Sequence, residues 1–238
     1  MKPTTTSHPR RIAPSAGRRL MATAGAAAAL ALAAPAAAQA HANAMPPHHD
    51  ATRPAAAHPT SRAALHDRMR ALWEQHVAWT RLAIVAFAAG APDLPATEAR
   101  LLRNQRDIGD AIAPFYGRAA GRALTKLLEE HIMGAVAVLQ AAKAGDAPAL
   151  ASAKAAWYAN GREVADFLSA ANPRHWPRAE MRSMMRTHLD QTLTEAVHEL
   201  SGRYAASVRT YDAIERHILA MADELSRGIV RQFPKRFG

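Results

Sequence analysis

Three histidines and one glutamate are the side chains of this sequence best suited to chemistry. They are His76, His131, His188 and Glu195, which lie in three separate segments of helical periodicity. Imidazole nitrogens and a carboxylate oxygen are ligands for zinc, iron, copper or nickel. Imidazoles beside carboxylates also serve as general acids and bases. The sequence therefore predicts a metal or ligand site built on these four residues, with acid-base catalysis as an alternative use.

A second set of polar residues falls on or beside the apolar side of the second, fourth and fifth helical segments. Its members are Asn104, Asp107, Asn160 and Thr192. We expect them to contact a bound ligand or to orient the imidazoles from behind. A buried polar group without a hydrogen bond costs about 1–3 kcal/mol, so a cluster of this size needs many partners. Such a cluster is expected to share a small ligand, a metal or water, unless each member pairs within a purely structural network.

The stretch 187-THLDQTLTEAVHEL-200 shows which spacing matters. At helical pitch His188, Thr192, Glu195 and Glu199 fall within an arc of about 60° that borders an apolar stripe. His198 forms a Glu-x-x-His pair with Glu195, but its side chain turns away around the helix. Binuclear carboxylate bundles use two such pairs that face each other. The spacing therefore favours the face that carries His188 over the Glu-x-x-His pair.

Six helices must position these side chains. Helical periodicity runs almost unbroken from residue 63 to the C-terminus, and no alternating run typical of strands interrupts it. Turn residues divide the run at 90–97, 114–117, 145–148, 172–177 and 201–203. Thr97 is expected to cap the second helix, and Asp146 the fourth. We predict an all-α, antiparallel bundle of about six helices with short loops over residues 63–238.

The N-terminal segment has the layout of a signal peptide. Four arginines precede an Ala/Leu run from Met21 to Ala34, and the small-residue stretch 36-AAAQAHA-42 follows, which predicts removal of residues 1–40. The paired arginines of 18-RRLMA-22 resemble a twin-arginine signal. We therefore expect export, by the general secretory or the twin-arginine route, to the periplasm or the extracellular space. The mature chain is expected to contain no integral membrane span.

Residues 41–62 are rich in Pro, Ala and His, a composition typical of a flexible linker. If cleavage follows Ala40, the new terminus at His41 and the stretch 48-HHD-50 offer a second, weaker site for copper or nickel. The alternative is a polar linker that happens to contain histidine.

Charge and cysteine content exclude several classes of function. The formal net charge is +10, and the first forty residues carry five cations and no acid, which leaves +5 for the rest. The remaining cations are scattered without interleaved aromatic residues, so we expect no nucleic-acid partner. The chain has no cysteine, which excludes disulfides, thiolate metal sites and cysteine nucleophiles.

Six segments of the chain resemble a family of small bacterial all-helical proteins of uncharacterised function. The segments are 72-LWEQHVAWTR-81, 101-LLRNQRDIGD-110, 128-LEEHI-132, 157-WYANGREVADFLSAANP-173, 187-THLDQTLTE-195 and 221-MADELSRGIVRQFP-234. The resemblance implies that the inward polar positions form a site typical of that group. Some members are labelled glycosyltransferase or acetylglutamate kinase. This sequence has no glycine-rich phosphate loop after a strand to support either label.

The leading expectation is an exported, non-catalytic bundle that binds a small ligand or metal ion through a buried His/Asn/Glu cluster. A purely structural polar network in an envelope interaction protein is the first alternative, with an envelope protein as its partner. A hydrolase that uses histidine and carboxylate acid-base pairs is the second alternative, although no nucleophile stands out in the sequence.

Overall fold

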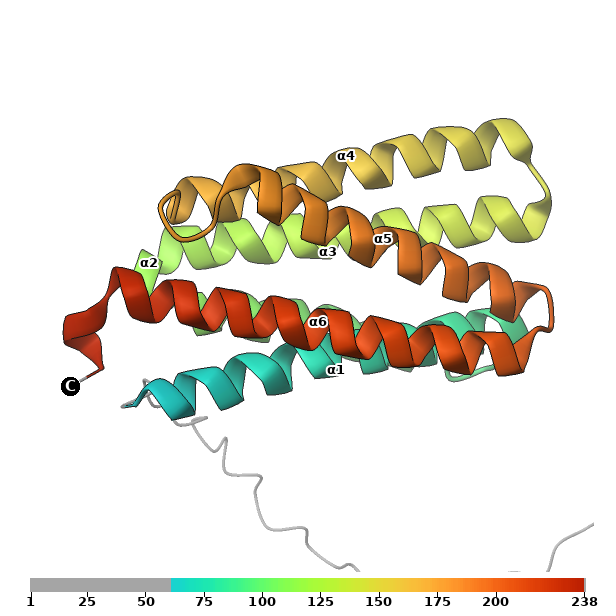
Figure 1. The fold of residues 1–238 in the computed structure, drawn as a ribbon. Coiled ribbons are helices and arrows are strands. Elements are labelled where there is room, and N and C mark those ends of the chain that lie inside the picture. The colour runs from blue at the N-terminus through green and yellow to red at the C-terminus, as the bar shows by residue number, and fades with distance from the viewer. Residues whose placement is uncertain (1–60, 238) are drawn as a thin grey trace, which may run out of the picture. The chain divides into compact units, whose positions relative to one another are not determined.

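A computed structural model describes residues 61–237 as a bundle of six α-helices (Figure 1). The elements in chain order are α1 (Arg62–Ala89), α2 (Leu94–Tyr116), α3 (Arg118–Ala144), α4 (Ala147–Ala171), α5 (Arg178–Leu200), α6 (Tyr204–Gln232) and a short 3-10 turn, η1 (Pro234–Arg236). This part of the chain contains no strand. The predicted all-α bundle of six helices is thus confirmed, and the predicted signal peptide and nearly all of the predicted linker lie outside the described residues.

The helices end at the turn residues that the sequence indicates, with one exception. Gly145 adopts a left-handed conformation, with φ 69°, and closes α3, after which the Asp146 side chain accepts a hydrogen bond from the Ala149 N–H and caps α4. The predicted cap at Thr97 is wrong. Helix α2 begins at Leu94, because Pro95 fits the first turn of a helix, where its missing N–H is not needed.

Consecutive helices pack against each other around a closed ring. Each helix contacts the next one along the chain, α6 returns to contact α1, and α5 also touches α1. Figure 1 shows the neighbouring helices running in alternating directions with short connections. The middle turns of α1, α2, α3 and α5 therefore face one another across the interior, which is where the predicted site residues lie.

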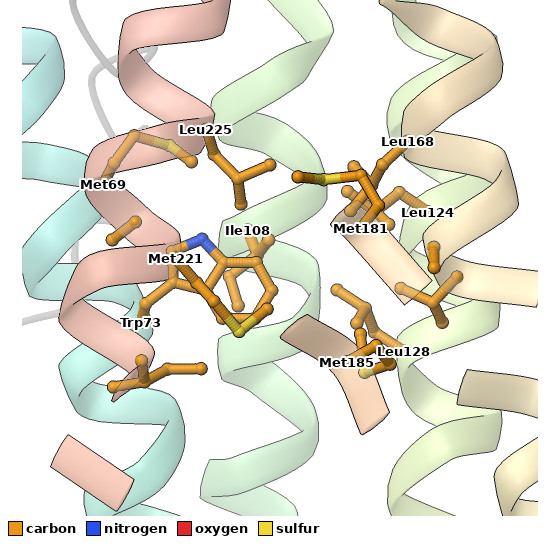
Figure 2. Packing of buried hydrophobic residues seen from close by; sticks show 14 of the residues in the cluster. Met69, Trp73, Ile108, Leu124, Leu128, Leu168, Met181, Met185, Met221 and Leu225 are labelled. Atoms are coloured by element: carbon orange, nitrogen blue, oxygen red, sulfur yellow. The ribbon is translucent and has the colours of Figure 1, made fainter. Parts of the chain in front are cut away.

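The interior is filled by large apolar side chains from all six helices. Figure 2 shows Met69 and Trp73 of α1 projecting inward together with Met221 and Leu225 of α6. Unbranched methionine side chains fill irregular gaps between helices well. Around the middle of the bundle this apolar packing gives way to buried polar groups.

Helices α2 and α3 approach each other closely at two glycines. A Cβ atom added at Gly121 would lie 2.7 Å from the carbonyl oxygen of Gly109, and one added at Gly109 would lie 2.0 Å from Thr125 Oγ1. Any larger residue would force the helices apart. The glycine pair therefore sets the spacing of the two helices one turn beyond Gln105, a residue of the site described below.

The C-terminal turn covers one end of the bundle. Phe237 is buried, and its ring stacks on that of Phe115 in α2 at a centroid distance of 5.7 Å. Within residues 61–237, no helix has the length and hydropathy needed to cross a membrane.

Candidate functional site

Three histidine rings from three helices meet in the centre of the bundle. The ring centroids of His76 (α1) and His188 (α5) are 5.6 Å apart, and those of His188 and His131 (α3) are 6.2 Å apart. The three residues are 2–4 % exposed. The structure therefore brings together three side chains that are separated by more than 50 residues along the chain.

The amide of Gln105 fixes the orientation of His76. Gln105 Nε2 donates to the carbonyl oxygen of Leu101 at 2.9 Å, which sets which end of the amide faces the ring. The same nitrogen lies 3.2 Å from His76 Nδ1, so the amide donates and the ring nitrogen accepts. In a neutral imidazole the other nitrogen, Nε2, then carries the proton.

The amide of Asn160 fixes His131 in the other tautomer, with the proton on Nδ1. Asn160 Nδ2 donates to the carbonyl oxygen of Leu127 at 3.1 Å, so Asn160 Oδ1 is the atom that faces His131 Nδ1, at 2.9 Å. An amide oxygen can only accept, so His131 Nδ1 carries the proton and Nε2 holds a lone pair. The Trp157 ring stacks on His131 at 5.3 Å, and its indole N–H donates to the His131 carbonyl oxygen.

Three buried polar atoms at the cluster lack a hydrogen bond. They are His188 Nδ1, Gln105 Oε1 and Trp73 Nε1, and all three belong to residues that contact His76. Native interiors leave few polar atoms unpaired, so unsatisfied groups gathered in one place indicate a position for water or a ligand.

Burial keeps the three rings neutral at pH 7. Desolvation lowers the pKa of His76 to about 3, the charge of His131 lowers it further, and the hydrogen bond from Gln105 opposes the shift. Desolvation likewise lowers the pKa of His131 to about 4, against the hydrogen bond to Asn160. Burial, followed by the charges of the other two rings and of His217, lowers the pKa of His188 well below its usual 6.5. The charges that shift the pKa values of His76 and His188 are those of other histidines.

An apolar cavity of ≈ 50 Å³ lies between α1, α2, α3 and α5, and the three histidines are not among the residues that line it. Two of its lining residues, Trp157 and Thr192, also touch the histidines, through the ring stack on His131 and a hydrogen bond from Thr192 Oγ1 to the His188 carbonyl oxygen at 2.9 Å. Thr80, on the opposite wall, donates in the same way to the His76 carbonyl oxygen at 2.7 Å. Both threonine hydroxyls are thus engaged by backbone, which explains why a cavity lined by threonine is apolar.

Glu195 belongs to a different cluster from the histidines. Its carboxylate accepts a hydrogen bond from Arg81 of α1, whose guanidinium also donates to Ser207 of α6 at 2.9 Å and lies 3.6 Å from Glu199. The Arg81 guanidinium also lies over the Tyr211 ring. Desolvation raises the pKa of Glu195 to about 7, Arg81 opposes the shift, and the charge of Glu199 adds to it.

The remaining predicted residues are less closely connected to the rings. Asn104 is fully buried, its side chain donates to the Leu72 carbonyl oxygen at 3.0 Å, and its Oδ1 lies 3.3 Å from Gln105 Nε2, so it supports the ring contacts only indirectly. Asp107 is half-buried on α2.

Sequence reasoning missed Gln105 and Arg81, the two residues that organise the clusters. Gln105 stands in register with Leu101, Ile108 and Ile112, so the apolar stripe of α2 already indicated that it faces inward. Arg81 follows Val77 by four residues on α1 and borders the same face as His76. Long polar side chains at such positions are usually exposed, which is why the pattern did not single them out.

The predicted metal set does not assemble as one group. Glu195 is turned to Arg81, and across residues 61–237 no group of three or more His, Asp or Glu side chains is arranged to hold a metal ion. The second predicted metal site, at His41 and 48–50, lies outside the described residues.

Comparisons with known proteins bring no relative to this site. No family model, no curated protein and no solved structure matches the chain. The function must therefore be argued from the geometry of the three rings.

Proposed function

We propose that this protein is a non-catalytic, exported binding protein that holds a small molecule inside the bundle, with the polar head of the ligand at His76, His131 and His188. The observation that supports the proposal is the group of three buried, neutral rings together with the unpaired buried atoms His188 Nδ1 and Gln105 Oε1, because unpaired buried atoms are costly. A purely structural network is expected to satisfy such atoms within the protein.

The ligand is also expected to carry a short apolar chain, which the cavity between α1, α2, α3 and α5 would hold. A water molecule needs roughly 10–15 Å³ of such space, so the cavity accommodates a few water molecules or a chain of about four carbon atoms. Several lining residues, among them Glu98, Val136 and Leu193, are partly exposed and mark a route from the surface. The head of such a ligand would reach the rings between Trp157 and Thr192.

The absence of an acid-base pair argues against the hydrolase alternative. The carboxylate that the sequence offered for that role, Glu195, is bound to Arg81, and Gln105 and Asn160 are the side chains hydrogen-bonded to the rings. A binding role needs only orientation and hydrogen-bonding capacity, and the two amides supply both.

Titration of the ¹⁵N-histidine-labelled chain with four-carbon probes tests the proposal. The probes are butan-1-ol, butanamide, butanoate and butylammonium, and the readout is the NMR signals of the three buried rings. We expect at least one probe to shift all three signals saturably. The variant Ala196→Leu, which fills the cavity from α5, should abolish the shift. The proposal fails if no probe moves the signals, or if filling the cavity changes nothing.

A further inference from the structure

The hydrogen bonds behind the rings determine which ligand chemistry the rings can accept. His76 presents an N–H at Nε2, because Gln105 occupies its Nδ1 as a donor. His131 presents a lone pair at Nε2, because Asn160 occupies its Nδ1 as an acceptor. The site therefore offers one fixed donor and one fixed acceptor. His188, whose Nδ1 has no hydrogen bond, can take either role.

Neutral amides hold the two fixed rings, because Gln105 donates to His76 and Asn160 accepts from His131. Within residues 61–237, Arg81, Glu195 and Glu199 form a separate ionic cluster. A ligand that carries a full charge would lose its hydration at the rings without meeting an opposite charge, which is strongly unfavourable in a buried site.

From this arrangement we infer that the ligand has a neutral head that both donates and accepts hydrogen bonds, as a primary amide does. The carbonyl oxygen of such a head accepts from His76 Nε2–H, and its N–H donates to His131 Nε2. This inference rests on the proposed function and specifies the class of molecule that the site takes.

The same hydrogen bonds make the three rings a poor metal site. A metal bound by all three rings needs a lone pair on His76 Nε2, and the proton would then move to Nδ1. That N–H would then face the NH₂ group of Gln105, and two donors that face each other repel. The amide does not flip to relieve this, because its NH₂ group donates to the Leu101 carbonyl oxygen. Ligating histidines normally donate their second N–H to an acceptor, as His131 does to Asn160.

The four probes separate the two proposals. Butanamide, butanoate and butylammonium share the same body, so their dissociation constants compare the heads alone. We expect butanamide to bind at least tenfold more tightly than either charged probe, and acetamide to bind more weakly than butanamide. If butanoate or butylammonium binds best, the neutral head is wrong while the binding function stands. If none binds, the function itself fails.

Replacing Gln105 tests which ring nitrogens donate and which accept, and the tautomer of His76 provides a readout besides ligand affinity. In Gln105→Glu the carboxylate accepts from His76 Nδ1–H, so the lone pair moves to Nε2. We expect the ¹⁵N spectrum to show this change of tautomer, butanamide to bind at least tenfold more weakly, and Zn²⁺ to bind where the unaltered chain binds none. The matched variant Asn160→Asp keeps an acceptor at His131 and should keep the His131 tautomer.

Two results would overturn the inference. One is an Nδ1–H tautomer of His76 in the unaltered chain. The other is stoichiometric Zn²⁺ binding at the three rings of the unaltered chain, detected by shifts of their ¹⁵N signals. If Gln105→Glu does not fold, Gln105→Leu serves in its place, because it removes the donor and should release His76 from the Nε2–H tautomer.

Discussion

Arg81 of α1 and Glu195 of α5 form an ion pair in which the carboxylate is buried and the guanidinium partly buried, and a second buried carboxylate, Glu199, shares the same guanidinium. The pair joins two helices that have few other contacts with each other. Two carboxylates and one guanidinium leave a net negative charge unless one carboxyl group is protonated. Burial is the main cause that raises the pKa of Glu195 to about 7, and the charge of Glu199 adds to it while Arg81 opposes it.

Removal of Arg81 should be strongly destabilising. In Arg81→Met both carboxyl groups stay buried without their cation, and the loss of one partner of a buried pair typically costs about 3–5 kcal/mol. Urea unfolding at pH 7 measures the change. The double variant Arg81→Met/Glu195→Gln should recover part of the loss, and an Arg81→Met protein as stable as the parent would show that the pair contributes nothing.

Glu195 should also make the fold less stable as the pH rises. Its pKa is raised from 4.5 in the unfolded chain to about 7 in the fold, so its contribution is fully present below pH 4.5 and is lost as the pH rises through about 7. Glu195→Gln removes this dependence, and the difference in unfolding free energy between variant and parent should change by about 2–3 kcal/mol from pH 4.5 to pH 7.5. A difference that does not vary with pH contradicts the raised pKa.

The buried histidines act in the opposite direction. Their pKa values are lowered in the fold, so below pH 6.5 the unfolded chain binds protons that the folded chain does not, and stability falls with the pH towards about 4. At pH 5 this amounts to about 2 kcal/mol for His76 and a similar value for His131.

Matched variants isolate this effect of the rings. His76→Gln should reduce the acid slope of the unfolding free energy relative to the parent chain. His175→Gln, in the loop between α4 and α5 and partly exposed, is the control and should leave the slope unchanged. Equal slopes for the parent chain and His76→Gln would mean that His76 is protonated in the fold.

The glycine contact between α2 and α3 should tolerate no side chain. Gly121→Ala gains helix propensity worth up to about 1 kcal/mol, but its Cβ would lie 2.7 Å from a backbone oxygen that cannot move alone. We expect a net loss of about 1–3 kcal/mol in urea unfolding, the usual cost of overpacking. Ala119→Ser, exposed on the same helix, is the control. A more stable Gly121→Ala protein would contradict this close approach.

The apolar spacing and turn residues of the sequence were enough to predict the bundle. Some helix ends have a local cause and can therefore be predicted from the sequence. Examples are the ends marked by Gly145 with Asp146 and by Gly202. Thr97 failed as a cap because Pro95 made an earlier start available. His76, His131 and His188 were predicted to face inward, because helical periodicity decides which face of a helix is buried.

The partners of the histidines could not be predicted in the same way. Whether Glu195 faces His188 or Arg81 depends on the rotation and offset of α1 against α5, which no spacing within one helix determines. The same holds for Gln105 and His76, which meet across α1 and α2. The hydrogen-bond direction that distinguishes a neutral ligand from a metal therefore appears only in three dimensions.

The ¹⁵N NMR spectrum of the buried imidazoles, recorded from pH 5 to pH 8, tests most directly whether the three rings are neutral and fixed in their tautomers. We predict three neutral rings across this range, with the proton of His76 on Nε2 and that of His131 on Nδ1. A ring of His76 or His131 that titrates near pH 6.5, or the same tautomer in both, would contradict it.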